Sequence, residues 1–482
     1  MKFSTNKKLI FSLILWLMLW AGYNANPQKL DFSNLLNLFH GIRAFFTIFA
    51  AFFALIFLLR RRSFSFQIFR TPLGFLSIYT LIGIISSIFL SRNPLLALYW
   101  AISYFSAFTV LLVVLADSNP ISSLSLLINL NWIIVFIITI GLFVLFLFQP
   151  GVISFLFSGN FLSGRPFENL AGVLAGKEIL GMVGTRPTGL GRYAGVAALV
   201  ALAKLLSEKR KLKLNWFFLF LFSYFLLIFS QARTAIFAFI FGFFIVFLLK
   251  SESKISIFGW SFFTSVQLVL VGLFLFYIPL FYTPHLLERM AIPEQQITIS
   301  KPSPPISESQ IPVSEPKKVT PEPQIPTPKP TAPISKPSSS KEMGAILFTL
   351  SGRTTGIWPQ AWKLFLKSPL IGWGFHADRI FLEGQHAHNA ILHSLIQTGI
   401  IGTIPFIIAF IWSWILLFKL LKSSSENEKP FLIEIAGVFA FFMTRGITES
   451  TGAFFGVDLI LLASLIAYIQ SLWFQKSQQL KS

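Results

Sequence analysis

The segment "LSLLINLNWIIVFIITIGLFVLFLF" (124–148) carries no charged side chain. A helix needs roughly 20 apolar residues to cross the hydrocarbon core of a bilayer, so this segment is long enough to span a membrane. Apolar runs of similar length recur along the chain, whereas the strongly alternating segments of a membrane β-barrel are absent. We therefore predict an all-α polytopic membrane protein.

Composition indicates the same class of protein. Of the 482 residues, 54% are hydrophobic and 12% are charged, and the mean hydropathy is +0.72. A soluble domain has about 25% charged residues, and a soluble fold could not bury so much apolar surface. These values exclude a soluble globular enzyme, a disordered chain and a fibrous repeat. The lack of cysteine excludes disulfide frameworks, thiolate zinc sites, iron–sulfur clusters and cysteine nucleophiles.

Hydropathy predicts about twelve transmembrane helices. The apolar runs lie near residues 9–23, 41–59, 72–90, 95–116, 124–148, 189–206, 215–231, 234–249, 255–281, 394–418, 431–448 and 452–474. The first run follows a group of lysines and has an alternative interpretation as a cleaved signal peptide. No small-x-small cleavage site follows it cleanly, so we interpret it as the first span.

Lys and Arg indicate the orientation, because cytoplasmic loops are rich in these residues. With a cytoplasmic N-terminus, the basic clusters at 60–70, 204–213, 250–254 and 419–429 all fall in predicted cytoplasmic loops. An even number of spans then places both termini in the cytoplasm. We assign the formal charge of +20 to these loops and to contacts with anionic membrane lipid, and we predict no nucleic-acid binding.

Two long loops are predicted on the outer face, at about 149–188 and 282–393. Within the second loop, residues 291–342 hold half of the 26 prolines and no aromatic residue, so this stretch cannot form a core. We interpret it as a disordered insertion. The predicted organisation is nine transmembrane helices in 1–281, a large outer loop with membrane-surface helices in 282–393, and three helices with a cytoplasmic tail in 394–482.

Several arginines are predicted at the outer edge of the membrane, where a charged side chain is costly to keep. Arg233 lies in a very short turn between two apolar spans, and Arg186 and Arg192 lie near the start of the sixth span. A guanidinium group matches phosphate oxygens with two hydrogen bonds, so converging arginines indicate a pyrophosphate site. The structural alternative for each arginine is a side chain at a helix end that extends to the membrane–water interface. Arg445 and Glu449 have the i,i+4 spacing of an ion pair on one helix face.

A further arginine, Arg353, lies in the first turn of a predicted amphipathic helix that follows Ser351. The helix dipole does not favour a cation at this position, so Arg353 indicates a bound anion. The predicted helix carries several tryptophans and is expected to lie against the membrane surface.

Four of the six histidines are concentrated in one short segment: His376, His386, His388 and His393. Their spacing does not match a known zinc motif, so we predict no metal site. A general base or a hydrogen-bonding positioner is favoured for His388, since imidazole titrates near neutrality. Glu383 is the nearest carboxylate in sequence and would either orient His388 or be solvated. The structural alternative for each histidine is a loop or cap residue.

Two of these segments resemble a known family. "SGRTTGIWPQAWKLFLKSPLIGWGF" (351–375), followed by "HNAILHSLIQTGIIG" (388–402), resembles the signature of the O-antigen ligase and O-antigen polymerase superfamily. The second segment fits its His-Asn-x-x-Leu pattern at His388 and Asn389, and Gly399 fits the spacing of its later glycine. "SQARTAIFAFIFG" (230–242) resembles a helix start of the same family.

The resemblance implies a glycosyltransferase of the inner membrane that uses a polyprenyl-pyrophosphate-linked glycan as donor. Transfer would take place on the outer, periplasmic face without a cofactor or metal. The positions carried over are Arg233 and Arg353 for the donor pyrophosphate and His388 for the acceptor hydroxyl. Arg186 or Arg192 would add a phosphate contact.

The acceptor is open at the level of sequence. A ligase would pass the glycan to lipid A core, a polymerase would join repeat units on their carriers, and a third relative would transfer glycan to protein. A membrane transporter is the alternative from another class, but it would need charged groups near the bilayer midplane. The marked residues are instead predicted at one membrane edge, which disfavours the transporter. Among the three transferases the sequence favours none strongly, and we place the ligase first and the polymerase second.

Overall fold

The computed structural model describes residues 5–23, 25, 27, 35–61, 71–147, 187–207, 213–230, 232–250, 356–382 and 384–479, and over these residues it contains helices and turns but no strand. This confirms the all-α class. Contacts group residues 1–271 and 352–482 into one unit, to which every described helix belongs. The loop at 149–188 and the proline-rich insertion lie almost entirely outside the described residues, and the proposed domain boundaries stay predictions.

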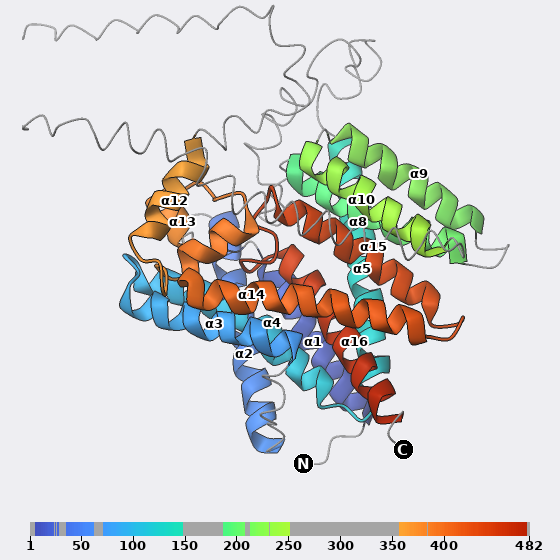
Figure 1. Cartoon of the computed structure of the whole chain (residues 1–482), viewed down its shortest axis with the longest axis horizontal. Coiled ribbons are helices and arrows are strands. Elements are labelled where there is room, and N and C mark those ends of the chain that lie inside the picture. Colours follow the sequence, from blue (N-terminus) through green and yellow to red (C-terminus); the bar gives the residue numbers. More distant parts are fainter. Residues whose placement is uncertain are drawn as a thin grey trace, which may run out of the picture. The chain divides into compact units, whose positions relative to one another are not determined.

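The helices of this unit are drawn in Figure 1. They are α1 (Thr5–Gly22), α2 (Leu35–Arg61), α3 (Pro72–Phe89), α4 (Pro94–Leu115), α5 (Pro120–Leu147), α8 (Pro187–Ser207), α9 (Lys213–Phe229), α10 (Arg233–Lys250), α12 (Trp358–Leu366), α13 (Ala377–Phe381), α14 (Ala390–Ser423), α15 (Lys429–Gly446) and α16 (Val457–Gln479). The starts of α3 and α4 follow ordinary capping chemistry. Each has a proline in its first turn, preceded by a Thr71 or Asn93 side chain that accepts a backbone N–H of that turn.

Eight of these helices are long and apolar enough to cross a membrane: Gly41–Arg60, Pro72–Phe89, Pro94–Leu115, Pro120–Val144, Thr188–Ser207, Arg233–Lys250, Ala390–Ser423 and Val457–Gln479. They indicate a multi-pass membrane protein. Eleven of the predicted runs coincide with described helices. The run at 255–281 lies outside the described residues, so the count of twelve stays a prediction. The last span begins later than expected, because residues 452–456 form a turn before Val457.

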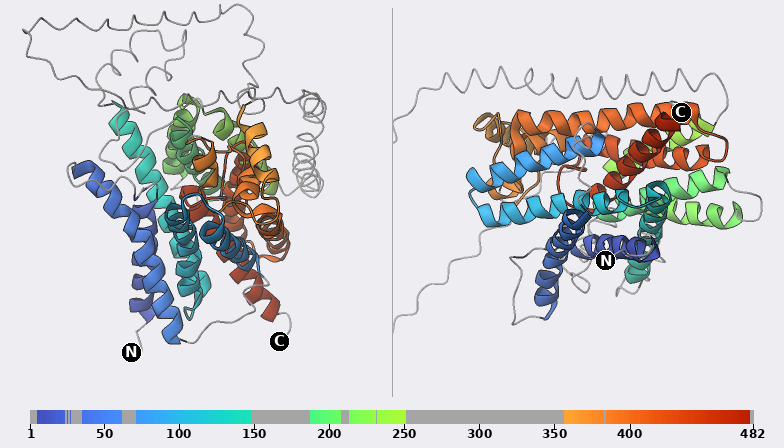
Figure 2. Two further views of the ribbon diagram at one scale, coloured as in Figure 1. Left: turned by 90° about the vertical axis from the view of Figure 1, so that its left-hand side faces the viewer. Right: turned by 90° about the horizontal axis from the view of Figure 1, so that it is seen from below.

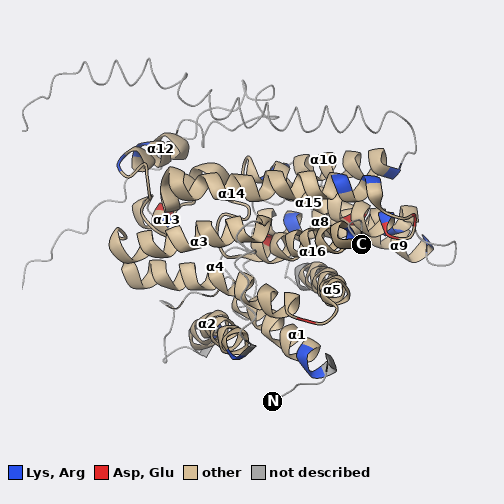
Figure 3. Cartoon of the chain, turned by 60° about the horizontal axis from the view of Figure 1, so that its bottom comes forward, with Lys and Arg blue, Asp and Glu red and all other residues tan. Residues whose placement is uncertain are grey.

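Small residues allow the helices to pack closely. Where α10 crosses α15, a Cβ atom on Gly242 would meet the carbonyl oxygen of Gly437, so the two backbones are in direct contact. The outward-facing surface of the unit is apolar, with Phe52, Phe218 and Phe247 each more than half exposed. Figure 3 shows long uncharged stretches in these helices, with Lys and Arg near the ends of α1, α10 and α12. Such a surface suits a lipid environment.

The helices α3 and α14 run side by side in opposite directions. The rings of Phe75 and Trp412 lie 5.8 Å apart, whereas Ser86, near the end of α3, donates to the carbonyl of Ile371, which leads into α13. The end of α3 and the start of α14 therefore lie at one end of the unit. In the left view of Figure 2, the start of α1 and the end of α16 both lie at the lower end of the unit, away from α12.

Candidate active site

Three helix beginnings and one helix end meet at the same end of the unit, which we call the site end. A Cβ atom on Gly191, in the second turn of α8, would clash with Ala232, which directly precedes α10. Gly446, the last residue of α15, faces Ala390, the first residue of α14. The positive ends of the α8, α10 and α14 dipoles therefore lie at one end, where they favour a bound anion.

A buried charge cluster joins α16 to this end. Arg192 of α8 lies with Nη1 3.2 Å from Oδ1 of Asp458, and Arg445 of α15 donates to Oδ2 of the same carboxylate. Two guanidinium groups share one aspartate, so the cluster keeps a net positive charge. Nε of Arg192 and Nε of Arg445 are buried and have no hydrogen-bond partner in the described structure. The pairing of Arg445 with Asp458 differs from the i,i+4 pair with Glu449 that the sequence spacing suggested.

Arg233 is the first residue of α10, and its side chain is exposed. The contact of Gly191 with Ala232 brings the start of α10 next to the turn of α8 that carries Arg192. The two predicted phosphate contacts thus lie on neighbouring elements at the site end. Arg186 and Arg353 lie outside the described residues, so their predicted convergence with Arg233 stays a prediction.

The side chain of His388 pairs with a carboxylate from another part of the chain. Nδ1 of His388 lies 3.0 Å from Oε2 of Glu449, which follows α15. A carboxylate only accepts hydrogen bonds, so a neutral His388 carries its proton on Nδ1 and its lone pair on Nε2. The His388 side chain is 29% exposed. It therefore has the arrangement of a general base oriented by a carboxylate.

Glu449 also connects His388 to the charge cluster. Its backbone N–H donates to the carbonyl of Arg445 at 2.9 Å, so both residues belong to the end of α15. One turn of chain thus carries the partner of His388 and one arginine of the cluster. Glu383, the carboxylate suggested by sequence proximity, lies outside the described residues.

The next residue, Asn389, fixes the start of α14. Its side-chain oxygen accepts from the N–H of Leu392 at 2.8 Å, and its amide group donates to the carbonyl of Ile447 at 2.7 Å. The first bond is an ordinary N-cap. The second ties the cap to the segment that carries Glu449, so Asn389 supports the position of His388.

The helix α14 is interrupted at Gly399, which has φ 60° and ψ −164°. The segment 368–374 crosses the interruption, and the N–H groups of Trp373 and Gly374 donate to the carbonyls of Ile396 and Gln397. In return, the carbonyls of Pro369 and Leu370 accept from the N–H groups of Ile400 and Ile401. The crossing satisfies the backbone groups freed by the break, which an apolar environment requires.

The glycine of the predicted signature therefore has a structural role. A Cβ atom on Gly399 would collide with the backbone of Leu370, and one on Gly372 would collide with the backbone of Gln397. Both residues also have positive φ. The "SPLIGWG" and "QTGIIG" segments are thus two halves of one backbone crossing that holds α13 and the start of α14 together.

Comparison with protein families places this region. Residues 217–407 match the family model described as O-antigen ligase. The chain contains an O-antigen ligase domain. This confirms the resemblance to the O-antigen ligase and polymerase superfamily. No curated protein matches the chain.

The O-antigen ligase domain runs from α9 into the first half of α14. It includes Arg233, Arg353, His388, Asn389 and Gly399. The partner of His388 and the members of the buried charge cluster lie outside it: Glu449, Arg192, Arg445 and Asp458. The site end is therefore completed by helices on both sides of the matched region.

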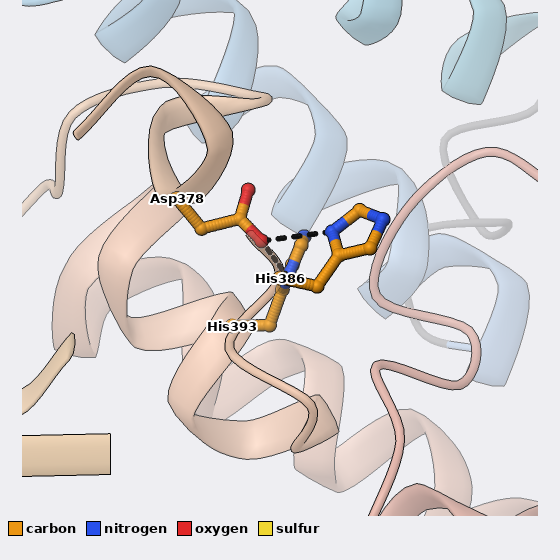
Figure 4. A group of neighbouring side chains, drawn as sticks. All are labelled: Asp378, His386 and His393. Carbon is orange, nitrogen blue, oxygen red and sulfur yellow. Dashed lines mark hydrogen bonds and ion pairs between the residues drawn. The ribbon is translucent and has the colours of Figure 1, made fainter. Parts of the chain in front are cut away.

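Two other histidines of the domain, His386 and His393, form a cluster around Asp378 of α13 (Figure 4). Nδ1 of His386 lies 3.0 Å, and Nδ1 of His393 2.9 Å, from Oδ2 of Asp378. Burial raises the pKa of the Asp378 carboxyl, but the charges and hydrogen bonds of His393 and His386 outweigh burial and hold this pKa well below its usual value. Burial lowers the pKa of His386, an effect that Asp378 opposes. Asp378 is therefore an anion between two imidazole rings.

Among the described residues, this cluster is the group that could hold a metal ion, since its three ligand atoms lie within 4.8 Å of one another. The contacts on its far side oppose that use. The guanidinium of Arg379 donates to Nε2 of His386, and the Gln397 amide nitrogen lies 2.6 Å from Nε2 of His393. Both rings then carry their protons on Nδ1, toward Asp378. A metal-bound histidine instead presents a lone pair to the metal and donates from its other nitrogen.

Sequence spacing did not identify the partners of three carboxylates in this region. Glu449 and Asp458 lie 61 and 266 residues from the His388 and Arg192 side chains that they pair with. Asp378 stands close to the histidines in sequence, but nothing in its neighbourhood distinguished it from a solvated loop aspartate.

Proposed function

We propose that this protein is a membrane glycosyltransferase of the O-antigen ligase type, which moves a glycan from a polyprenyl-pyrophosphate carrier to an acceptor hydroxyl such as that of lipid A core. The observation that carries this proposal is the His388–Glu449 pair at the end of the unit where arginines and helix beginnings gather. The matched O-antigen ligase domain supports the donor class. The proposed location is the inner membrane, with the site on the periplasmic face and both termini in the cytoplasm.

The acceptor side of the reaction needs a base. A sugar hydroxyl is a poor nucleophile until its proton can leave. With Nδ1–H held by Glu449, Nε2 of His388 accepts that proton while the hydroxyl oxygen attacks the anomeric carbon. The imidazolium that forms is stabilised by the Glu449 carboxylate, 3.0 Å from Nδ1.

The donor side needs fixed positive charge. As the bond from the anomeric carbon to the pyrophosphate oxygen breaks, negative charge develops on the lipid pyrophosphate, which leaves with the bonding electron pair. In this proposal Arg233, with Arg353 and Arg186, holds that pyrophosphate, while the net charge of the buried Arg192–Arg445–Asp458 cluster stabilises it from behind. Direct attack would invert the anomeric carbon, and no step requires a metal.

Ligase and polymerase share this donor chemistry and differ in the acceptor. A polymerase would present a second carrier-linked glycan to His388, and a protein glycosyltransferase would present a Ser or Thr hydroxyl. We place the ligase first, then the polymerase, then the protein transferase, and last the transporter.

The proposal is tested by reconstituted transfer. Purified protein in lipid vesicles would receive a polyprenyl-pyrophosphate glycan, with lipid A core in one reaction and further carrier-linked glycan in another. Single transfer to core is the expected result, and elongation on the carrier would indicate a polymerase. His388→Ala and Arg233→Ala are expected to lose roughly 100-fold or more in rate, as for the loss of a general base or a charge clamp.

The Glu449→Gln variant tests whether the His388–Glu449 pair contributes to catalysis beyond the His388 imidazole itself. The glutamine side chain would keep the size of the glutamate but lose the charge that stabilises the imidazolium, so kcat is expected to fall roughly tenfold or more. Glu426→Gln is the control, because Glu426 is an exposed carboxylate paired with Lys429 on the α14–α15 turn. Unchanged kcat in Glu449→Gln, with loss of activity in His388→Ala, would contradict the role of the pair.

A further inference from the structure

The Asp378 cluster is not used by the proposed mechanism, although it adjoins the proposed base. It connects three separate elements: Asp378 comes from α13, His386 from the segment before α14, and His393 from the first turn of α14. The Asp378 carboxylate is fully buried. Keeping an aspartate ionised in such a place is costly unless it receives several hydrogen bonds.

Those hydrogen bonds come mainly from the segment 386–389, which we call the histidine strap. Oδ2 of Asp378 faces Nδ1 of His386 and also accepts from the backbone N–H of Ala387 at 3.3 Å. The next two residues are held elsewhere, His388 by Glu449 and Asn389 by Ile447 and Leu392. Every residue of the strap therefore has its own anchor, and Asp378 supplies the first two.

The strap is held in a conformation that its sequence alone would not favour. His388 has φ 50°, in the left-handed region that non-glycine residues rarely adopt. Such a backbone persists only when the surrounding structure determines it. The residue directly before it, Ala387, is fully buried and carries the N–H that Asp378 accepts. Asp378 thus holds the backbone at Ala387, one residue before the strained backbone of His388.

We propose that Asp378 is a positioning residue for the transfer reaction: by accepting from the His386 ring and the Ala387 N–H, it holds the histidine strap so that Nε2 of His388 faces the acceptor hydroxyl. This inference rests on the proposed function. Arg379 donates to Nε2 of His386, so the proton of this ring lies on Nδ1 toward Asp378, which is the arrangement of a hydrogen-bonded anchor.

The test compares Asp378→Asn with wild type in the reconstituted transfer assay. Asparagine keeps the shape but offers a weaker, uncharged acceptor, so the strap is expected to loosen. Because misplacement of a catalytic group by about 1 Å can cost roughly 100-fold, kcat should fall tenfold to 100-fold. The KM for the donor should stay within about twofold, since the arginines are untouched. Asp117→Asn is the matched control, because Asp117 accepts from Ser118 and Ser123 in the α4–α5 turn, and no change is expected.

Two further variants of His386 distinguish anchoring from other roles of the ring. His386→Gln retains a donor toward Asp378 and should keep most of the activity, whereas His386→Ala should behave like Asp378→Asn. Hydrogen–deuterium exchange gives a readout that does not depend on transfer. The 384–392 peptide should exchange faster in Asp378→Asn, while peptides of α16 should be unchanged.

The outcomes separate this inference from the proposed function. Wild-type kcat in Asp378→Asn, or unchanged exchange of the strap, overturns the positioning role while leaving the proposed function intact if His388→Ala is inactive. Transfer that is lost in EDTA and restored by Zn²⁺ would make the cluster a metal site and also overturn it. A wild-type protein that transfers no glycan to any acceptor would overturn both proposals.

Discussion

At the scale of single residues, the site is organised by carboxylates that each orient a nitrogen group. Glu449 orients His388, Asp378 anchors the histidine strap, and Asp458 joins two arginines. In each case the acceptor holds a group whose position matters for chemistry or for packing. The histidines that look alike in the sequence therefore have different roles. Among the described histidines that pair with a carboxylate through Nδ1, His388 has the most exposed side chain.

His376 gives a prediction about pH. Its ring stacks on Trp100 with centroids 5.1 Å apart. The pKa of His376 is lowered to about 4, mainly by burial. The charge of Asp378 opposes this lowering of the pKa, and the charges of Arg379 and His386 add to it. Between about pH 6.5 and pH 4 the unfolded chain therefore binds a proton at this residue that the folded protein does not, so stability falls as the pH is lowered through this range.

We expect the unfolding temperature in detergent to drop between pH 7 and pH 4.5, and to drop less in His376→Asn. Asparagine tolerates the positive φ of 66° at this position and does not titrate. His386, whose pKa is also lowered, contributes a dependence of the same sign that remains in the variant. Equal pH dependence in wild type and His376→Asn would contradict this assignment.

At the scale of helices, the break in α14 is what brings the site together. The interruption at Gly399 admits the 368–374 segment, and this segment leads directly into α13 and Asp378. The half of α14 before the break carries Asn389 and His393 at its start. A continuous helix would have no place for the crossing segment, so the position of α13 depends on it.

Gly399→Ala is therefore expected to destabilise the fold. Its φ and ψ belong to a region that is essentially restricted to glycine, and forcing another residue there costs about 1–3 kcal/mol before the collision with Leu370 is counted. The unfolding temperature should fall by several degrees. Gly141→Ala in α5 is the control, because a Cβ atom there meets no other group within 4 Å. A variant at position 399 as stable as the control would show that the crossing contributes nothing.

At the scale of the whole unit, contacts between helices show which turns lie at the site end and which lie at the opposite end. The turn that follows α3 belongs to the site end, because Ser86 contacts Ile371, whereas the α14–α15 turn lies beyond Trp412 at the opposite end. The basic residues of the α14–α15 turn favour a cytoplasmic location. The proposed orientation then puts the site end outside.

The chain contains no cysteine, so introduced cysteines can test this orientation directly. A membrane-impermeant maleimide applied to intact spheroplasts is expected to label Ser91→Cys, in the turn after α3. It should label Ser425→Cys, in the exposed α14–α15 turn, only after the membrane is opened. The reverse pattern would place the site in the cytoplasm and would contradict the proposed use of a donor presented on the periplasmic face.

The helical class, most of the spans and the family domain that contains the candidate site followed from the sequence alone. Apolar length is a local property, so runs such as 72–90 and 394–418 indicated α3 and α14 directly. The signature around His388, Asn389 and Gly399 also identified the family domain that residues 217–407 match. The start of α16 was wrong by several residues, because the buried turn at 452–456 is as apolar as a span.

Only the tertiary structure decided which groups meet. Sequence spacing suggested Glu449 for Arg445 and left Glu383 as either a partner of His388 or a solvated carboxylate. The fold pairs Arg445 with Asp458 and His388 with Glu449. Side-chain partners across 61 or 266 residues depend on how helices pack and where α14 breaks, and hydropathy contains no information about either. The sequence determined which residue types are available to the site. Helix packing determined which of them pair, because a hydrogen bond needs its two heavy atoms within about 3 Å of each other.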